Sequence, residues 1–402
     1  MKFASLETAR ERLRAGGMIV LVDDEHRENE GDLVAAAEMV TAETVNFMAT
    51  HGRGWICLAL DGEACRRLDL APMVAENTAR FGTAFTVTIE AREGVTTGIS
   101  AADRAHTMRI AASADARASD LVRPGHVQPI RARPGGVLAR AGQTEGSVDL
   151  CRLAELRPAG VICEIMNPDG AMARLPDLEK FCALHDLPLC SVAQIIEHRR
   201  RTEKLIGHAA TARMPTRFGE FLLHAYRAEI GDESHYALAT PDLLPGGPGV
   251  EEAVLARVHS ECLTGDVFHS LRCDCGEQLQ SAIEAVAREG RGVVVYMRQE
   301  GRGIGLDNKL RAYALQEKGL DTVEANERLG FAADLRDYGL GAQILADLGL
   351  RRLRLMTNNP RKLAGLSGHG LEIVERVSIA MPARDQNRAY LDAKRDKMGH
   401  LI

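Results

Sequence analysis

Short apolar runs alternate with stretches of helical spacing along most of this chain. Apolar residues recur at helical intervals over residues 3–13, and residues 307–318 have helical composition. Four short runs predict strands, namely residues 17–22, 160–166, 292–297 and 353–356, and the first three have the β-branched content of buried strands. Strands and helices that alternate in this way predict an α/β (α+β) fold with mixed sheets.

The length of the chain predicts two such domains. Its 402 residues exceed what a single hydrophobic core ordinarily accommodates. A basic run at residues 195–204, which we interpret as a helix end or linker, closes the apolar pattern of the first half. New strands are expected at residues 218–226 and 236–239. We therefore expect two mixed-sheet α/β domains in tandem, residues 1–205 and 206–402.

The amino-acid composition limits the classes of partner and the cellular compartment that we expect for this protein. A charged fraction of 26% and a hydrophobic fraction of 45% describe a soluble protein, and no apolar run approaches the ~20 residues that span a bilayer. A net charge of −6 with 4% aromatic residues argues against a nucleic-acid partner. Nine cysteines scattered through apolar segments, without an apolar signal core at the start, predict a reducing cytoplasm.

Three cysteines gather in one segment of the second half that we expect to be rich in loops. Cys262, Cys273 and Cys275 form a C-x10-C-x-C pattern. Three thiolates can hold a zinc ion and leave its fourth position open, as catalytic zinc requires. Two alternatives stay open at this point: a structural zinc closed by His259 or His269, and three free thiols.

In the first half, a run of charges at residues 23–32 directly follows the strand at residues 17–22. Charged runs are most often solvated loops, but α/β folds place their chemistry at the ends of buried strands. The hard oxygen ligands of Glu28 and Asp32 suit Mg²⁺. Glu164, which ends another apolar run, is either aimed into a cleft or an ordinary strand-end residue.

Arg140 and Thr144 could hold a sugar phosphate through guanidinium and hydroxyl donors. Four strings, DDEHRENEGD, GVTTGISAADR, RPGHVQPIRA and VICEIM, then occur in this order. Together they resemble 3,4-dihydroxy-2-butanone 4-phosphate synthase of riboflavin biosynthesis over about residues 1–200. The resemblance implies a homodimer that converts ribulose 5-phosphate to the butanone phosphate and formate with Mg²⁺ (or Mn²⁺). The implied roles are substrate binding by Arg27, Asp32, Arg140 and Thr144, metal binding by Glu28, proton transfer by Glu164, and a supporting role for His126.

One position departs from the pattern of that family. Gln143 stands where the family has a metal-binding histidine. An imidazole is a good ligand for a divalent ion and can carry a proton, whereas a glutamine amide is a weaker donor that cannot titrate. We expect the N-terminal domain to be impaired or inactive as a synthase and kept as a dimerisation scaffold. The alternative is that Gln143 coordinates adequately and both activities are present.

In the second half, a glycine-rich segment at residues 298–306 separates a strand from a helix. This layout lets backbone N–H groups hold phosphates, although many such loops are only tight turns. The segment is not a Walker loop, because the G-x-x-x-x-G-K-[ST] spacing is absent. Arg302 within it favours a polyphosphate ligand.

The cysteine cluster and the strings RQEGRGIGL, DTVEANERLGFAADLRDY and TNNPRKL resemble GTP cyclohydrolase II from about residue 211 to residue 402. The resemblance implies that the three cysteines bind a catalytic zinc. It also implies that GTP is converted to 2,5-diamino-6-(5-phosphoribosylamino)pyrimidin-4(3H)-one, formate and pyrophosphate. The implied GTP contacts are Arg257, Val258, His259, Ser260, Glu261, Gln278, Glu300, Gly301, Arg302, Thr322, Thr357 and Lys362.

Three further residues take catalytic roles by the same resemblance. Tyr313 assists ring hydrolysis, and Asp334 accepts a proton. Arg336 attacks the α-phosphate, but a guanidinium is a poor nucleophile, so the alternative is a charge clamp on the leaving pyrophosphate. Taken alone, Asp334 and Arg336 would be read as a surface ion pair. An alternative from another class is a GTP-binding regulatory protein with a structural zinc.

Overall fold

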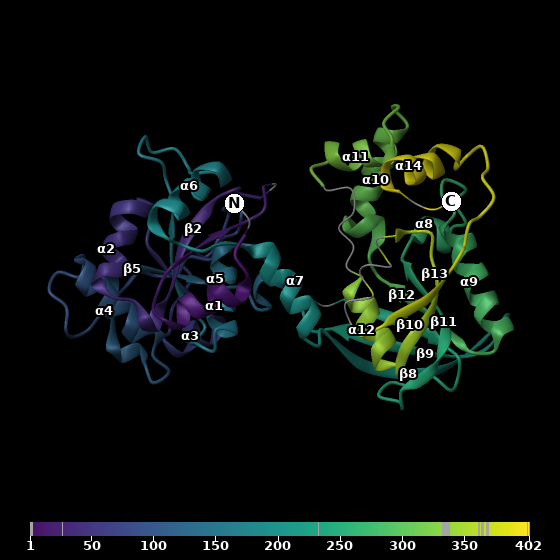
Figure 1. The fold of residues 1–402 in the computed structure, drawn as a ribbon, viewed down its shortest axis with the longest axis horizontal. Coiled ribbons are helices and arrows are strands. Elements are labelled where there is room, and N and C mark those ends of the chain that lie inside the picture. The colour runs from purple at the N-terminus through teal and green to yellow at the C-terminus, as the bar shows by residue number, and fades with distance from the viewer. Residues whose placement is uncertain are drawn as a thin grey trace. The chain divides into compact units, whose positions relative to one another are not determined.

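The computed structural model describes residues 3–25, 27–231, 233–331, 338–360, 362, 366, 370–399 and 401. It divides into two compact units, Met1–Arg199 and Arg200–Ile402 (Figure 1). Each unit contains one seven-stranded sheet with both parallel and antiparallel neighbours. The prediction of two mixed-sheet α/β domains in tandem is therefore confirmed. The basic run does not interrupt secondary structure, because it lies largely within helix α7 (Val192–Thr202).

The N-terminal sheet has the strand order β4-β5-β3-β6-β2-β1-β7. Its strands are β1 (Ile19–Val22), β2 (Gly31–Ala36), β3 (Cys57–Leu60), β4 (Ile89–Ala91), β5 (Leu121–Arg131), β6 (Ala159–Glu164) and β7 (Leu189–Ser191). The α-helices of this unit are α1 (Leu6–Arg14), α2 (Ala42–Phe47), α3 (Gly62–Arg67), α4 (Ala101–Ala112), α5 (Gln143–Leu153), α6 (Leu175–His185) and α7.

Both faces of this sheet are covered. In β1, Val20 and Val22 enter one core cluster, whereas Ile19 and Leu21 enter another. Because successive side chains of a strand point to opposite faces, the two clusters lie on opposite sides of the sheet. A strand buried on both faces explains why β1 appears in the sequence as a continuous apolar run.

The C-terminal sheet has the order β14-β13-β11-β12-β10-β9-β8. Its strands are β8 (Ile206–Thr216), β9 (Gly219–Ala228), β10 (Ser234–Ala239), β11 (Val250–Ser260), β12 (Gly292–Met297), β13 (Leu350–Met356) and β14 (Glu372–Val377). The α-helices are α8 (Leu263–Asp266), α9 (Cys275–Glu289), α10 (Gly305–Gln316), α11 (Thr322–Arg328), α12 (Gly339–Asp347) and α14 (Arg388–Met398).

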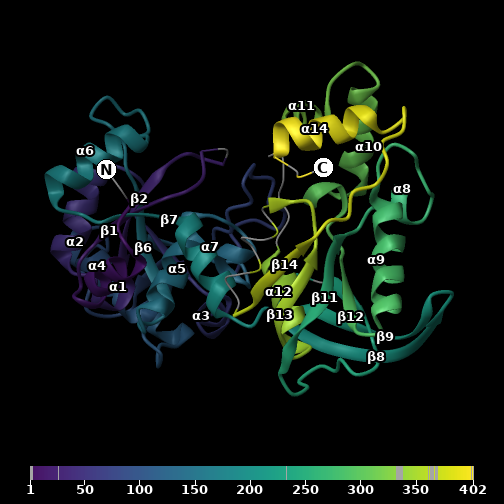
Figure 2. The ribbon, with the colours of Figure 1, turned by 45° about the vertical axis from the view of Figure 1, so that its right-hand side comes forward.

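The strands β11, β12 and β13 run parallel, so their carboxyl ends meet at one edge of the sheet. Figure 2 shows this unit from a second side, and both views place α14 beside α10 and α11. The segments that follow the three strand ends carry Cys262, Glu300 and Thr357. Residues distant in sequence are thereby gathered in one region.

None of the helices in the described part of the chain is long and apolar enough to cross a bilayer.

Candidate active sites

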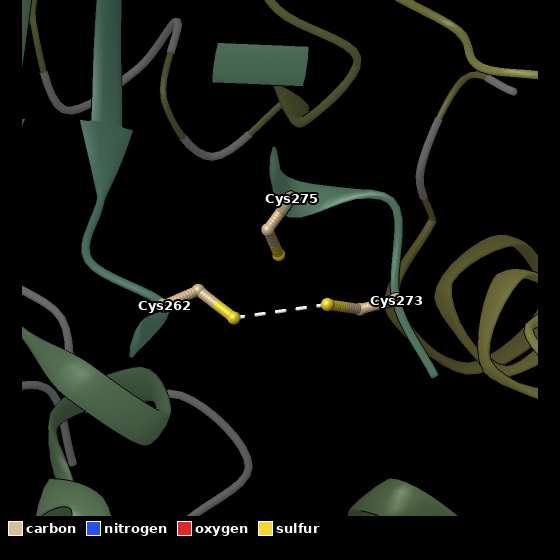
Figure 3. A group of neighbouring side chains, drawn as sticks. All are labelled: Cys262, Cys273 and Cys275. Carbon is tan, nitrogen blue, oxygen red and sulfur yellow. Dashed lines mark hydrogen bonds between the residues drawn. The ribbon is translucent and has the colours of Figure 1, made fainter. Parts of the chain in front are cut away.

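The three predicted cysteines converge in the C-terminal unit (Figure 3). Cys262 follows β11, whereas Cys273 precedes helix α9 and Cys275 is its first residue. Their Sγ atoms all lie within 4.8 Å of one another, and those of Cys262 and Cys273 are 3.7 Å apart. The segment is less irregular than predicted, because the short helix α8 fills part of the interval.

This geometry fits a tetrahedral zinc. Zn–S bonds of about 2.3 Å at tetrahedral angles place two sulfur atoms about 3.8 Å apart. Gly265 allows the close packing, since a Cβ atom there would lie 3.0 Å from Cys273 Sγ and 3.2 Å from Cys262 Sγ. Among the described residues, neither His259 nor His269 joins the group that could hold an ion.

The thiols are not equivalent. Hydrogen bonds from Cys273 and Cys275, assisted by the Lys309 ammonium, lower the pKa of Cys262. The hydrogen bond with Cys262 raises the pKa of Cys273 to about 11. Cys262 is therefore the thiol that carries the negative charge most readily in the absence of metal.

Lys309 of helix α10 connects this cluster to the glycine-rich segment. Its Nζ donates to Cys262 Sγ at 3.1 Å and to Glu300 Oε1 at 2.8 Å. It also lies 3.0 Å from Thr264 Oγ1. Glu300 in turn accepts from the backbone N–H of Leu263 through Oε2 at 2.6 Å. Glu300 thus binds the cysteine segment directly and through Lys309.

Tyr313 lies one helical turn after Lys309. Its hydroxyl is 3.3 Å from Thr264 Oγ1, and the Lys309 Nζ lies 5.7 Å from the centre of its ring. Burial raises the pKa of Tyr313. The phenol is therefore protonated at neutral pH and can act as a hydrogen-bond donor.

His259 forms a buried pair with Asp266. Its Nε2 lies 3.2 Å from both carboxylate oxygens, and burial lowers the pKa of this histidine. Asp266 also accepts from the Tyr296 hydroxyl at 2.8 Å and from the Cys262 N–H at 3.0 Å. The pair therefore fixes the backbone at the first cysteine.

The structure brings most of the predicted residues to one pocket. Its lining includes the cysteines and Arg257, His259, Ser260, Glu261, Gln278, Glu300, Gly301, Tyr313, Thr322, Thr357 and Lys362. Val258 instead lies in the core, and its carbonyl accepts from Lys362 Nζ at 2.7 Å. The side chain of Arg302 and the whole of Asp334 and Arg336 lie outside the described residues.

Two cationic residues of this pocket, Lys309 and Lys394, were not predicted from the sequence, and neither was Asp274 beside it. Lys309 had a usable signal, because it stands four positions before Tyr313 and so on the same helix face. Asp274 stands between Cys273 and Cys275, and the cysteine pattern assigns it no role. Lys394 comes from the C-terminal helix, and nothing local connects it to the cluster.

In the N-terminal unit, the loop after β1 meets the start of α5. Arg27 donates to Asp23 Oδ2 at 2.6 Å, to Glu28 Oε1 at 3.1 Å and to Gln143 Oε1 at 3.1 Å. Gln143 is the first residue of α5, and its Nε2 donates to the Glu30 carbonyl at 3.2 Å. The oxygen and the nitrogen of the Gln143 amide therefore both bond to the loop that follows β1.

Arg140 approaches the same place. Its guanidinium donates to Glu145 Oε2 at 2.7 Å and to Thr83 Oγ1 at 3.1 Å. A Cβ atom on Gly142 would lie 2.5 Å from Arg140 and 2.9 Å from Arg27, so both guanidinium groups pack against this glycine. Thr144 is buried in the first turn of α5.

Asp32 and Glu164 face each other on neighbouring strands. They are register partners in the antiparallel pair β2–β6, so their side chains share one face. Glu164 Oε2 accepts from the backbone N–H of Trp55 at 2.8 Å. His126 pairs elsewhere, with its Nδ1 2.6 Å from Glu90 Oε2. It lies on β5, which is separated from β6 by β3.

We predict that Asp32→Asn stabilises the N-terminal unit at pH 8 by about 1–2 kcal/mol. Burial, followed by the charge of Glu164, raises the pKa of Asp32 well above its usual value. The folded state therefore loses stability as pH rises from the ordinary carboxyl range through this raised pKa. Asparagine lacks that charge, so its advantage should disappear below about pH 4.

Urea titration followed by Trp55 fluorescence measures this effect, because Trp55 is the one tryptophan of the chain and lies in this unit. Asp115→Asn, at an exposed carboxyl of the same unit, is the control and should change nothing. An equal gain at pH 8 and at acidic pH would contradict the prediction.

The tandem sheets, the strand-end carboxylates and the three-thiol pocket define a two-domain α/β enzyme. The family model for 3,4-dihydroxy-2-butanone 4-phosphate synthase matches residues 7–198, and the model for GTP cyclohydrolase II matches residues 207–378.

Similar proteins extend over the whole chain. Riboflavin biosynthesis protein RibBA of Aquifex aeolicus (strain VF5) is 57% identical over 100% of this chain and 98% of its own. RibBA of Salinispora tropica is 56% identical over 100% of this chain and 99% of its own. RibBX, a two-domain 3,4-dihydroxy-2-butanone 4-phosphate synthase from A. baumannii, is 36% identical with a TM-score of 0.70. That match covers 94% of this chain and 100% of the other.

The chain belongs to the RibBA family of riboflavin biosynthesis proteins. It is an enzyme of that pathway, with a 3,4-dihydroxy-2-butanone 4-phosphate synthase domain followed by a GTP cyclohydrolase II domain. By family, the substrates of these domains are ribulose 5-phosphate and GTP. Both resemblances predicted from the motifs are confirmed.

Proposed function

We propose that the C-terminal domain is a working, zinc-dependent GTP cyclohydrolase II in a cytoplasmic homodimer. It converts GTP to 2,5-diamino-6-(5-phosphoribosylamino)pyrimidin-4(3H)-one, formate and pyrophosphate. The observation that carries this proposal is the three-thiol cluster, with its 3.7 Å sulfur separation, in the wall of one pocket. Cys262, Cys273 and Cys275 hold the zinc, which when bound activates water as a nucleophile.

The charge of the pocket suits a nucleoside triphosphate. Among its described lining residues, five are Lys or Arg and two are Glu. An excess of cationic groups in a concave site attracts and orients an anionic ligand. We assign the triphosphate to Arg257, Arg302 and Lys362, with further GTP contacts from His259 to Glu261, Gln278, Glu300, Gly301, Thr322 and Thr357.

Tyr313 supports the hydrolytic step as a neutral phenol. Because burial keeps it protonated, it is suited to donate a hydrogen bond or a proton during ring hydrolysis. Asp334 accepts a proton, and Arg336 acts at the α-phosphate as nucleophile or as charge clamp. Trapping of a covalent guanylyl–Arg336 adduct would decide for nucleophilic attack.

Release of formate and pyrophosphate from GTP by the zinc-loaded chain tests this function. Formate reports ring hydrolysis, and pyrophosphate reports cleavage at the α-phosphate. Bound GTP without either product would instead support the regulatory alternative.

We also propose that the N-terminal domain retains its substrate site but is impaired as a synthase. Arg27, Asp32, Arg140 and Thr144 hold ribulose 5-phosphate, and Glu28 binds Mg²⁺ (or Mn²⁺). Glu164 transfers protons and His126 supports it. The engagement of the Gln143 amide, with Arg27 at one end and the Glu30 carbonyl at the other, supports the impairment. This amide holds the loop and can neither titrate nor match an imidazole as a ligand.

We therefore expect Gln143→His to raise the rate of 3,4-dihydroxy-2-butanone 4-phosphate formation at least ~10-fold, in line with the usual contribution of a metal-site residue. The measurement is product formation from ribulose 5-phosphate with Mg²⁺. Gln143→Asn retains an amide and should give no gain. A wild-type rate already equal to that of Gln143→His would show that both domains are fully active.

A further inference from the structure

A buried ion pair joins the C-terminal helix to the cysteine cluster. Asp274 lies between Cys273 and Cys275 and is 1% exposed. Its Oδ1 accepts a 2.7 Å hydrogen bond from Nζ of Lys394 in α14, which is 9% exposed. Two charges withdrawn from water in this way are stable only while they remain paired.

Hydrogen bonds connect Asp274 to Gln278 and Arg257, which line the pocket. Asp274 Oδ2 accepts from Gln278 Nε2 at 2.6 Å, and Gln278 Oε1 accepts from Arg257 at 2.6 Å. Arg257 also donates to the carbonyl of Met356 at 2.8 Å. One continuous hydrogen-bonded chain therefore crosses α14, α9, β11 and β13, and two of its members are assigned above to GTP.

Helix α14 is held in place independently of this pair. Lys397 bonds to Asp321 and Glu324, at 3.0 Å for the latter. The backbone N–H of Leu401 donates to the carbonyl of Asn358 at 2.8 Å. Helix α14 also follows the last residue of the family-model match, which ends at residue 378.

From these contacts we propose that Lys394 is a positioning residue of the GTP cyclohydrolase site. Its ammonium fixes Asp274, and Asp274 fixes both the Cys273–Cys275 segment and the Gln278–Arg257 pair. Without that cation the buried carboxylate turns toward water. The backbone of Asp274 then shifts and carries Cys273 and Cys275 with it. The hydrogen bond from Gln278 to the Asp274 side chain is lost at the same time. This inference rests on the proposed zinc and GTP functions.

The test is Lys394→Met in the full chain, with Arg395→Met as the control, because Arg395 is an exposed cation of the same helix that pairs with Asp392 and Asp396 of the helix itself. We expect Lys394→Met to weaken zinc retention in a chelator competition by about 10–100-fold, the usual effect of losing an outer-shell partner of a metal ligand. GTP binding by the zinc-loaded protein should weaken in parallel. Arg395→Met should match the wild type in both measurements.

A second variant separates positioning from general stability. Lys394→Met/Asp274→Asn removes both charges and should recover part of the lost zinc retention, because no unpaired carboxylate remains. This expectation applies even if the single variant folds poorly. Zinc retention in Lys394→Met equal to that of Arg395→Met, or a double variant no better than the single one, would overturn the proposal. A wild type that retains no zinc would instead overturn the proposed function itself.

Discussion

Replacing Cys273 by serine is expected to remove the bound zinc and reduce formate release from GTP by at least ~10³-fold. The cluster offers three thiolates, and a serine hydroxyl remains protonated at neutral pH and binds zinc weakly. Two thiolates alone do not retain the ion against a chelator. Since the proposed hydrolysis depends on that ion, the loss should affect kcat and not only KM.

Zinc content per chain and formate release are the paired measurements. Cys182→Ser is the matched control, since it makes the same change at a buried thiol of the other unit. Burial raises the pKa of Cys182 to about 12, so this thiol is inert. The control should keep one zinc per chain. Full formate release by zinc-free Cys273→Ser would exclude a catalytic zinc.

The parts of the site that could be predicted from sequence are those encoded by local spacing. The C-x10-C-x-C pattern predicted that three thiols converge, and continuous apolar runs were sufficient for β1 and β12, because strands buried on both faces leave that signal. The Asp32–Glu164 pair was found only as two separate strand-end residues. Their apposition depends on the register of β2 and β6, which no local pattern specifies.

Long-range pairs were beyond sequence reasoning for the same reason. Lys394 and Asp274 are separated by 120 positions and are joined only when α14 packs beside the cluster. The composition of α14 did not indicate that Lys394 has a buried partner, since a lysine on a charged helix is ordinarily a solvated residue. Burial of both partners, known only from the structure, changes that interpretation.

The two domains differ in how their charges are balanced. Around the C-terminal pocket, the side chains of Asp266, Asp274 and Glu300 are largely withdrawn from solvent, and each has a hydrogen-bonding or cationic partner. In the N-terminal site, Asp32 faces Glu164, and burial followed by the charge of Glu164 raises the pKa of Asp32. Unrelieved repulsion of this kind is expected where a bound cation completes the site. It would account for the stability cost that we predict for Asp32.

We expect Lys309 to be required for efficient turnover. Lys309→Met should lower kcat/KM for GTP by about 10²-fold or more, consistent with the cost of breaking a buried ion pair. The Lys309 and Glu300 side chains are 11% and 10% exposed. Burial alone would lower the pKa of Lys309, but Cys262 and Glu300 outweigh it and raise the pKa. The ammonium is therefore charged throughout the neutral range.

Three measurements distinguish this role from a purely structural one. Lys309→Arg keeps the charge and should recover part of the activity, whereas Lys318→Met, at an exposed lysine just after the same helix, should have no effect. The pH profile of kcat/KM between pH 6 and 9 should keep its shape in Lys309→Arg, because neither cation titrates there. In Lys309→Met the remaining thiolate and Glu300 charges repel the triphosphate, so KM should rise more steeply at low ionic strength than in the wild type. Equal activity of Lys309→Met and Lys318→Met would remove Lys309 from the site.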